Sequence, residues 1–149
     1  MADPFPSKTY AVGWWFLLIG FLGQVPLGLS VAFGYRWSIW GWHRRRMAEA
    51  LWGTATIPAE AWPVADQLLA MLGATMACWG LAMAFVVAVP LRRREPWAWW
   101  CVASSALLWF TVDTGLSAAH GVWVNVAFNC AAGVMIGAPM ALVWPSGGD

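Results

Sequence analysis

Four long stretches of the chain contain no charged residue, and they dominate its pattern of hydrophobic and polar positions. They cover residues 9–35, 67–91, 97–112 and 121–145. A membrane-spanning helix needs about 20 apolar residues, and the first, second and fourth stretches reach that length directly. The third reaches it only if its helix continues past Asp113 to residue 119. The pattern therefore predicts four spanning helices, over about 10–35, 64–91, 97–119 and 122–144.

Composition supports a membrane protein. Of the 149 residues, 61% are hydrophobic and only 10% are charged, whereas a soluble domain carries about a quarter charged residues. The net charge of +1 offers no electrostatic basis for a nucleic-acid partner. The predicted fold is therefore all-α, a single transmembrane domain over residues 1–149 that forms a four-helix bundle in the lipid bilayer. Four crossings return the chain to its starting side, so both termini are expected on the same side.

Tryptophan gives a second argument for four crossings, because its ring favours the membrane–water interface. We call the side that holds the N-terminus side A and the opposite side B. The helix ends expected on side A carry Trp14, Trp15, Trp97, Trp99, Trp100 and Trp144. Those expected on side B carry Trp37, Trp40, Trp42, Trp62 and Trp123, and only Trp79 and Trp109 fall near the middle.

The orientation in the membrane is left open by the basic residues. Side A carries Lys8 and the arginines at 92–94, and side B carries Arg36 and the arginines at 44–46. The positive-inside rule needs an excess of Lys and Arg on one side, and here the two sides are equal. The very short loop around residues 92–94 favours side A as the cytoplasmic side. The N-terminal residues lack the pattern of a signal peptide, so we expect an uncleaved first span.

The longest connection, about residues 36–63, lies between the first two predicted spans. A helix there would gather its apolar side chains on one face, formed by Met47, Ala48, Leu51 and Trp52. Arginines and a glutamate lie off that face, which is typical of a short helix in the membrane interface. A solvated basic loop is the alternative interpretation.

Polar side chains gather in the side B half of the predicted bundle. Asp113, Ser117 and His120 follow an i, i+4, i+7 spacing and share one helix face. The other members are Gln24, Asp66, Asn125 and Asn129. A carboxylate facing lipid at the depth of Asp113 costs several kcal/mol. We therefore expect Asp113 to face a polar pocket open to side B, with Asn125, Asn129, Gln24 and Thr114 as donors and His120 as counter-ion.

Several uses of this polar cluster fit the sequence. It can be a hydrogen-bonded network that only fixes helix packing. It can instead bind, and even transform, a lipophilic small molecule. Asp113 and His120 are then the candidate catalytic pair, and the ligand-binding residues are Gln24, Asp66, Ser117, Asn125 and Asn129. Asp66 has a competing explanation as a helix cap, because it follows Pro63 at a helix start. A proton path through Asp113 is a further alternative.

Metal and cofactor chemistry have little support in the sequence. Cys78, Cys101 and Cys130 lie in apolar runs and form no C-x-x-C motif, which favours buried free thiols over a disulfide or a thiol relay. His120 has no second histidine near it, so its spacing is poor for a metal site. A lone axial histidine can still hold a haem-type or chlorophyll-type ring. No metal is predicted, the cofactor is left open, and so is the question whether the protein is an enzyme.

Two stretches resemble a known family. LRRREPWAWW (91–100) and WFTVDTGLSAAHGVWVNVAFN (109–129) are similar to the small four-span bacterial membrane proteins grouped as DoxX-like, which often have a short basic loop and a Trp-rich start to the third span. The resemblance implies a multi-pass protein of the cell inner membrane. It also implies an alternative function, a non-enzymatic accessory or anchor subunit of a larger, quinone-linked membrane complex, or a homo-oligomer. No cysteine or cofactor motif here carries that redox chemistry.

Overall fold

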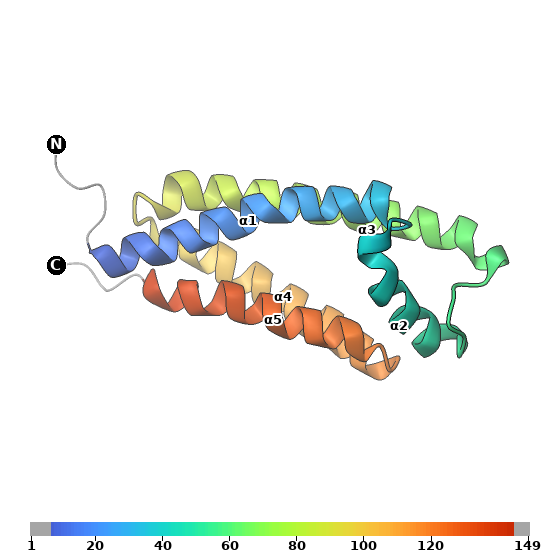
Figure 1. Ribbon diagram of the computed structural model, residues 1–149. Helices are drawn as coiled ribbons and strands as arrows, with labels where there is room; N and C mark the ends of the chain where they lie inside the picture. The colour runs from blue at the N-terminus through green and yellow to red at the C-terminus, as the bar shows by residue number, and fades with distance from the viewer. Residues whose placement is uncertain (1–6, 145–149) are drawn as a thin grey trace.

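Four long helices form the protein. The computed structural model describes residues 7–144, and its elements there are all helical. The long helices are α1 (Lys8–Gly34), α3 (Trp62–Val86), α4 (Pro96–Ala119) and α5 (Trp123–Leu142), and they run along a common direction in Figure 1. Each is long and apolar enough to cross a membrane. The predicted all-α architecture with four candidate spans is confirmed. The helix bounds lie within two residues of the predicted ranges, except that α3 ends at Val86 and the chain continues to the predicted end, Leu91, as a π-helical turn.

The connection between the first two spans contains a short helix. α2 (Gly41–Trp52) follows the 3-10 turn η1 (Ser38–Trp40) and crosses the direction of the long helices, as Figure 1 shows. A second 3-10 turn, η2 (Ala59–Ala61), leads into α3. Ala48 of α2 is fully buried against Val31 and Tyr35. The predicted helix between the spans is therefore present, and packing against α1 holds it in place.

α1 and α3 make the closest helix contact in the bundle, and glycine makes it possible. A Cβ atom on Gly28 would lie 2.6 Å from the backbone nitrogen of Ala77 and from the carbonyl oxygen of Gly73. A Cβ on Gly73 would clash with the backbone of α1 at Gly28 and Ala32. Small residues allow this backbone-to-backbone approach, which drives helix association in membranes through van der Waals packing.

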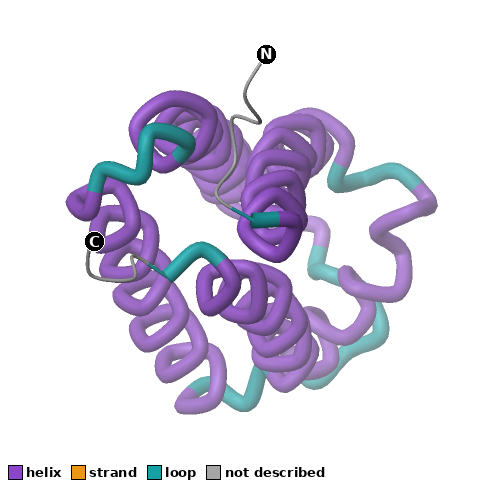
Figure 2. The backbone as a smooth tube through the Cα atoms, turned by 90° about the vertical axis from the view of Figure 1, so that its left-hand side faces the viewer, coloured by secondary structure: helices purple, strands orange, loops and turns teal. Residues whose placement is uncertain are grey.

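The four long helices are arranged in the order α3, α1, α5, α4 around the bundle, which Figure 2 shows end-on. α1 packs on both α3 and α5, and α5 packs on α4, whereas α3 and α4 touch each other little. The start of α1 lies beside the end of α5, because a Cβ on Gly13 would lie 2.8 Å from that of Leu142. Midway along the bundle the rings of Trp79 and Trp109, 6.1 Å apart, bring α3 and α4 together.

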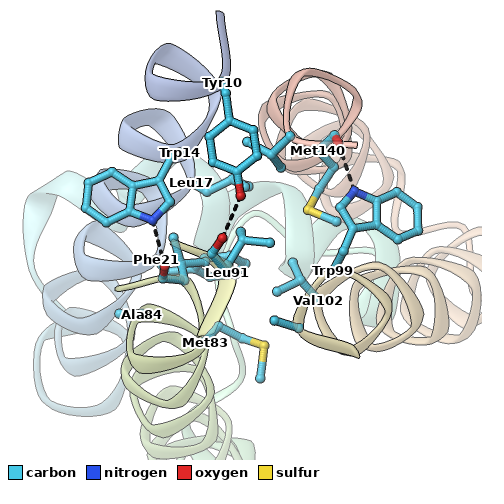
Figure 3. Packing of buried hydrophobic residues seen from close by; sticks show 13 residues of the cluster. Tyr10, Trp14, Leu17, Phe21, Met83, Ala84, Leu91, Trp99, Val102 and Met140 are labelled. Atoms are coloured by element: carbon cyan, nitrogen blue, oxygen red, sulfur yellow. Dashed lines mark hydrogen bonds between the residues drawn. The ribbon is translucent and has the colours of Figure 1, made fainter. Parts of the chain in front are cut away.

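The main apolar core lies at one end of the bundle, where aromatic side chains also satisfy backbone carbonyls. α3 finishes in a π-helical turn, η3 (Val87–Leu91), which contains Pro90. The indole of Trp14 donates to the carbonyl of Val87 at 2.7 Å, and the Tyr10 hydroxyl donates to that of Leu91 at 2.5 Å. Trp99 of α4 donates to a carbonyl near the end of α5 in the same way, and Figure 3 shows all three bonds.

Candidate functional site

The Asp113 side chain lies between α4 and α5 and accepts hydrogen bonds from both helices. Asn129 donates to Oδ2 at 3.0 Å, and Asn125 donates to Oδ1 at 3.3 Å. Ser117, one turn along α4, donates to Oδ1 at 3.5 Å and accepts from Asn125 at 2.8 Å. Four of the seven residues singled out in the sequence therefore form one connected polar cluster, which we call the Asp113 cluster.

The helical spacing of these residues and a tight turn explain the geometry of the Asp113 cluster. Asp113 and Ser117 are four residues apart on α4, and Asn125 and Asn129 are four apart on α5, so each pair shares a face. The turn between the helices uses Gly121 at a φ of +71°, a left-handed conformation that glycine adopts without strain. Ser117 and Asn129 are buried, and Asp113 is half-buried.

His120 is not among the partners described for Asp113. α4 ends at Ala119, and His120 is its C-cap residue with φ −93° and ψ 5°. The i, i+7 register that would place His120 beside Asp113 requires a continuing helix, and the helix stops one residue too early. His120 is exposed. The counter-ion role expected for it has no counterpart in the described contacts.

Gln24 and Asp66 also lie outside the Asp113 cluster. Gln24 packs against α3, where a Cβ on Gly80 would meet its side chain at 2.9 Å. Asp66 forms an ion pair with Arg36 at 2.6 Å, which links the end of α1 to α3. The helix-cap interpretation of Asp66 is wrong, because α3 already begins at Trp62 and Asp66 lies a full turn inside it. Thr114, a further expected donor, has a buried hydroxyl without a hydrogen-bond partner in the described chain.

Two cavities of the described chain lie away from the Asp113 cluster. One, of about 480 Å³, opens beside Ala88, Val89, Arg92 and Arg93. The other, of about 280 Å³, lies between α2 and the start of α3 and is lined in part by Arg44, Arg45 and Trp62. Neither is lined by Asp113 or its partners, so the expected polar pocket stays a prediction.

α2 is held to α1 by side chains that the sequence reasoning did not single out. The Tyr35 hydroxyl and the His43 Nδ1 are 2.7 Å apart. The His43 ring also lies 5.8 Å from Trp40 and 5.5 Å from Phe128 of α5. Arg44 donates to the backbone carbonyls of Tyr35 and Trp37. In the sequence only the aromatic residues around 35–43 indicate this arrangement. The bonds of His43 and Arg44 do not join residues with the spacing of neighbours on one helix.

The burial of His43 leads to a pH-dependence prediction. Burial lowers the pKa of His43 below its usual value of 6.5. When α2 is packed on α1, which we call the docked state, His43 therefore favours the neutral imidazole. The undocked segment binds more protons between the two pKa values. Docking is therefore fully stable above about pH 6.5 and weakens as the pH falls through the undocked pKa towards the docked one. Amide hydrogen exchange in α2 should be faster at pH 5.5 than at pH 7.5, after correction for the intrinsic exchange rate.

His43→Gln is the matched variant for this pH prediction. Glutamine retains a polar side chain next to Tyr35 but does not titrate in this range. The corrected exchange rate of α2 in His43→Gln should be the same at both pH values. An unchanged pH dependence in this variant would assign the effect to another group.

The described residues contain no group of three or more His, Cys, Asp or Glu side chains that could hold a metal ion. Cys78 and Cys130 are exposed on the bundle surface and Cys101 is half-buried. The sequence predicted buried thiols, and for Cys78 and Cys130 that prediction is wrong, because these positions face outward from their helices.

The chain was also compared with known proteins. No protein-family model, no curated protein and no solved structure matches it.

Proposed function

We propose that this multi-pass membrane protein binds a lipophilic small molecule through the Asp113 carboxylate. In this proposal the bound molecule carries a hydrogen-bond donor, such as a hydroxyl or an ammonium group, and its apolar part lies along α4 and α5. The observation that carries the proposal is a half-buried carboxylate within a spanning helix, held by three neutral donors.

The acceptor capacity of Asp113 supports this function. A carboxylate offers about four lone-pair sites. Oδ2 accepts one described bond, and the two bonds to Oδ1 are long, at 3.3 and 3.5 Å. No ion pair of the described chain involves Asp113. Ionisable residues within a membrane span are costly, and their partner often marks a functional site. A ligand donor would supply the partner that Asp113 lacks.

The surroundings of Asp113 favour a lipophilic ligand. Val112 and Leu116, its neighbours on α4, are 51% and 57% exposed. A molecule that enters from the hydrocarbon would meet these apolar side chains before it reaches the carboxylate. Apolar walls with a few polar groups are the usual composition of small-molecule sites.

The proposal is binding and not chemical conversion. An acid–base mechanism needs the two groups within hydrogen-bond reach of one reacting molecule. His120 is outside the described contacts of Asp113 and lies beyond the end of α4.

The proposed topology has both termini on side A of the membrane, with the Asp113 cluster in the side B half and α2 in the side B interface.

Native mass spectrometry of the gently solubilised protein tests the proposed function. Wild type should carry a non-covalent small-molecule adduct, and its mass identifies the ligand. Asp113→Asn should lose at least nine-tenths of this adduct, because a hydrogen bond to a charged group contributes about 1.5–3 kcal/mol, roughly tenfold or more in affinity. Asp66→Asn is the matched control. It removes one carboxylate outside the Asp113 cluster and should keep the adduct.

A second candidate function, an accessory or anchor subunit of a larger membrane complex, is favoured by the outer surface of α4. In the most apolar 18-residue stretch of α4, only 11% is buried within the chain, the lowest share among the four spans. In the same experiment a subunit would bring stoichiometric partner proteins, retained equally by wild type and Asp113→Asn. Such partners without any small-molecule adduct would overturn ligand binding and leave the Asp113 cluster as a packing device.

A further inference from the structure

The cavity between α2 and the start of α3 has the properties of an anion site. Its volume is about 280 Å³. Two arginines, Arg44 and Arg45, lie in its wall, and none of its lining residues is acidic. We propose that this cavity binds a phosphate group, carried by an anionic phospholipid headgroup or present as free phosphate. This inference is independent of the proposed function at Asp113.

Arg44 is positioned in advance for such a ligand. Its Nη1 donates to the carbonyl oxygens of Tyr35 and Trp37, at 2.5 and 2.6 Å. These bonds fix the plane of the guanidinium. A guanidinium has five N–H donors in a rigid fork, and the bonds described for Arg44 use only Nη1. The remaining donors are available to a tetrahedral anion, which arginine binds with two parallel hydrogen bonds.

Arg45 adds charge that its own surroundings do not neutralise. Its Nε donates to Glu49 at 2.9 Å, but the same carboxylate also accepts from Arg46 at 3.1 Å. One acid is therefore shared between two cations on the surface of α2. Of these three residues only Arg45 lines the cavity. Arg44 and Arg45 both line the cavity, and a bound phosphate would balance their positive charge.

The rest of the cavity wall includes uncharged residues, which can contact the ester group attached to a phosphate. The ring of Trp62 lines the cavity and is itself covered by the Arg36 guanidinium, 4.1 Å from its centroid. Gly41 also lines the cavity and contributes no side chain to its wall. A Cβ there would meet only Arg44 Nη2, at 3.9 Å. A larger residue at position 41 therefore has room to enter the cavity, and the helical backbone at Gly41 accepts any residue.

Exposed apolar side chains next to the cavity favour a phospholipid as the source. Ile39, Trp42 and Leu51 are exposed on the same segment, beside the exposed arginines of α2. Tryptophan, leucine and arginine on the outside of one short helix are typical of a helix that lies at the boundary between headgroups and acyl chains. That boundary is where lipid phosphates are located.

Native mass spectrometry with added phosphatidylglycerol tests the proposed site. Wild type should bind a first lipid molecule more tightly than any later one. Arg45→Gln should weaken this first binding about tenfold, and Gly41→Leu should remove it by filling the cavity without changing the charge. Arg46→Gln and Ala50→Leu are the matched controls. Arg46→Gln removes the same charge and Ala50→Leu introduces the same side chain, both on α2 at positions that do not line the cavity. Each should alter the first binding less than twofold.

Two further ligands identify the source of the phosphate. Phosphatidylcholine should bind the first site more weakly than phosphatidylglycerol, because its choline cation is repelled by the arginines. Inorganic phosphate that binds with the same dependence on Arg45 and Gly41, and competes with the lipid, would assign the site to the free anion and still support it. Equal losses in Arg45→Gln and Arg46→Gln would indicate only diffuse attraction to α2 and overturn the proposal. The absence of a preferred first ligand in wild type would also overturn it.

Discussion

Gly73→Leu should break the contact between α1 and α3 and destabilise the protein by about 3 kcal/mol or more, the upper end of overpacking costs. The added side chain would meet backbone atoms of Gly28 and Ala32. A clash with a flexible side chain can be relieved by a rotamer change, but here the opposing helix itself must move. Loss of helicity followed by circular dichroism during a titration with sodium dodecyl sulfate would measure the effect.

Gly20→Leu is the control for this prediction. Gly20 lies on α1, and a Cβ atom there would meet nothing within 4 Å. An outward-facing leucine suits lipid, and replacing glycine within a helix gains up to about 1 kcal/mol. The variant should therefore be as stable as wild type or slightly more stable. If both substitutions destabilised the protein equally, the α1–α3 contact would not be the one that the structure describes.

Asn129→Leu should destabilise the protein by about 1–3 kcal/mol, because it removes a donor from a carboxylate within a membrane span. Asn129 is only 4% exposed, and its bond to Asp113 is the shortest that the carboxylate accepts in the described chain. Within a membrane span, water cannot easily replace the lost donor. The same titration with sodium dodecyl sulfate would measure the change.

A double-mutant cycle separates this electrostatic cost from the change in side-chain shape. When both members of a buried polar pair are replaced by apolar groups, the cost is much smaller than when one is removed. Asp113→Leu combined with Asn129→Leu should therefore be more stable than Asn129→Leu alone. Purely additive effects of the two substitutions would show that the two side chains do not interact.

The helices could be predicted from the sequence because uncharged runs of this length have few alternatives. Even the third long helix, whose uncharged run ends before Asp113, follows from the length that a span requires. Helix contacts were harder to predict. Gly133 and Gly137 form a G-x-x-x-G motif. A Cβ on Gly133 would meet the Phe110 ring of α4 at 3.2 Å, but one on Gly137 would meet nothing within 4 Å. The close contact instead joins Gly28 to Gly73, on two helices whose relative register no local pattern reveals.

The candidate site was predictable to the same extent. Asp113, Ser117, Asn125 and Asn129 lie together because helical periodicity and a tight turn determine their positions. The prediction that His120 lies beside Asp113 depended on one extra residue of helix, and the ends of helices are the least certain feature of a sequence prediction. The cavity at α2 was beyond prediction, because it is formed by α2, residues 55–57 and the start of α3, which come together only in the folded chain.

The aromatic side chains that donate to backbone carbonyls at the end of the bundle that holds the main apolar core have a consequence for biosynthesis. A polar backbone group within the bilayer must find a partner inside the protein. In all three bonds the donor precedes the acceptor in the chain: Tyr10 and Trp14 come before η3, and Trp99 comes before Met140. As the nascent chain leaves the ribosome, each of these carbonyls is synthesised after the side chain that will satisfy it. The helices can thus be released into lipid in their order of translation, and the end of α3 and α5 find their donors already in place.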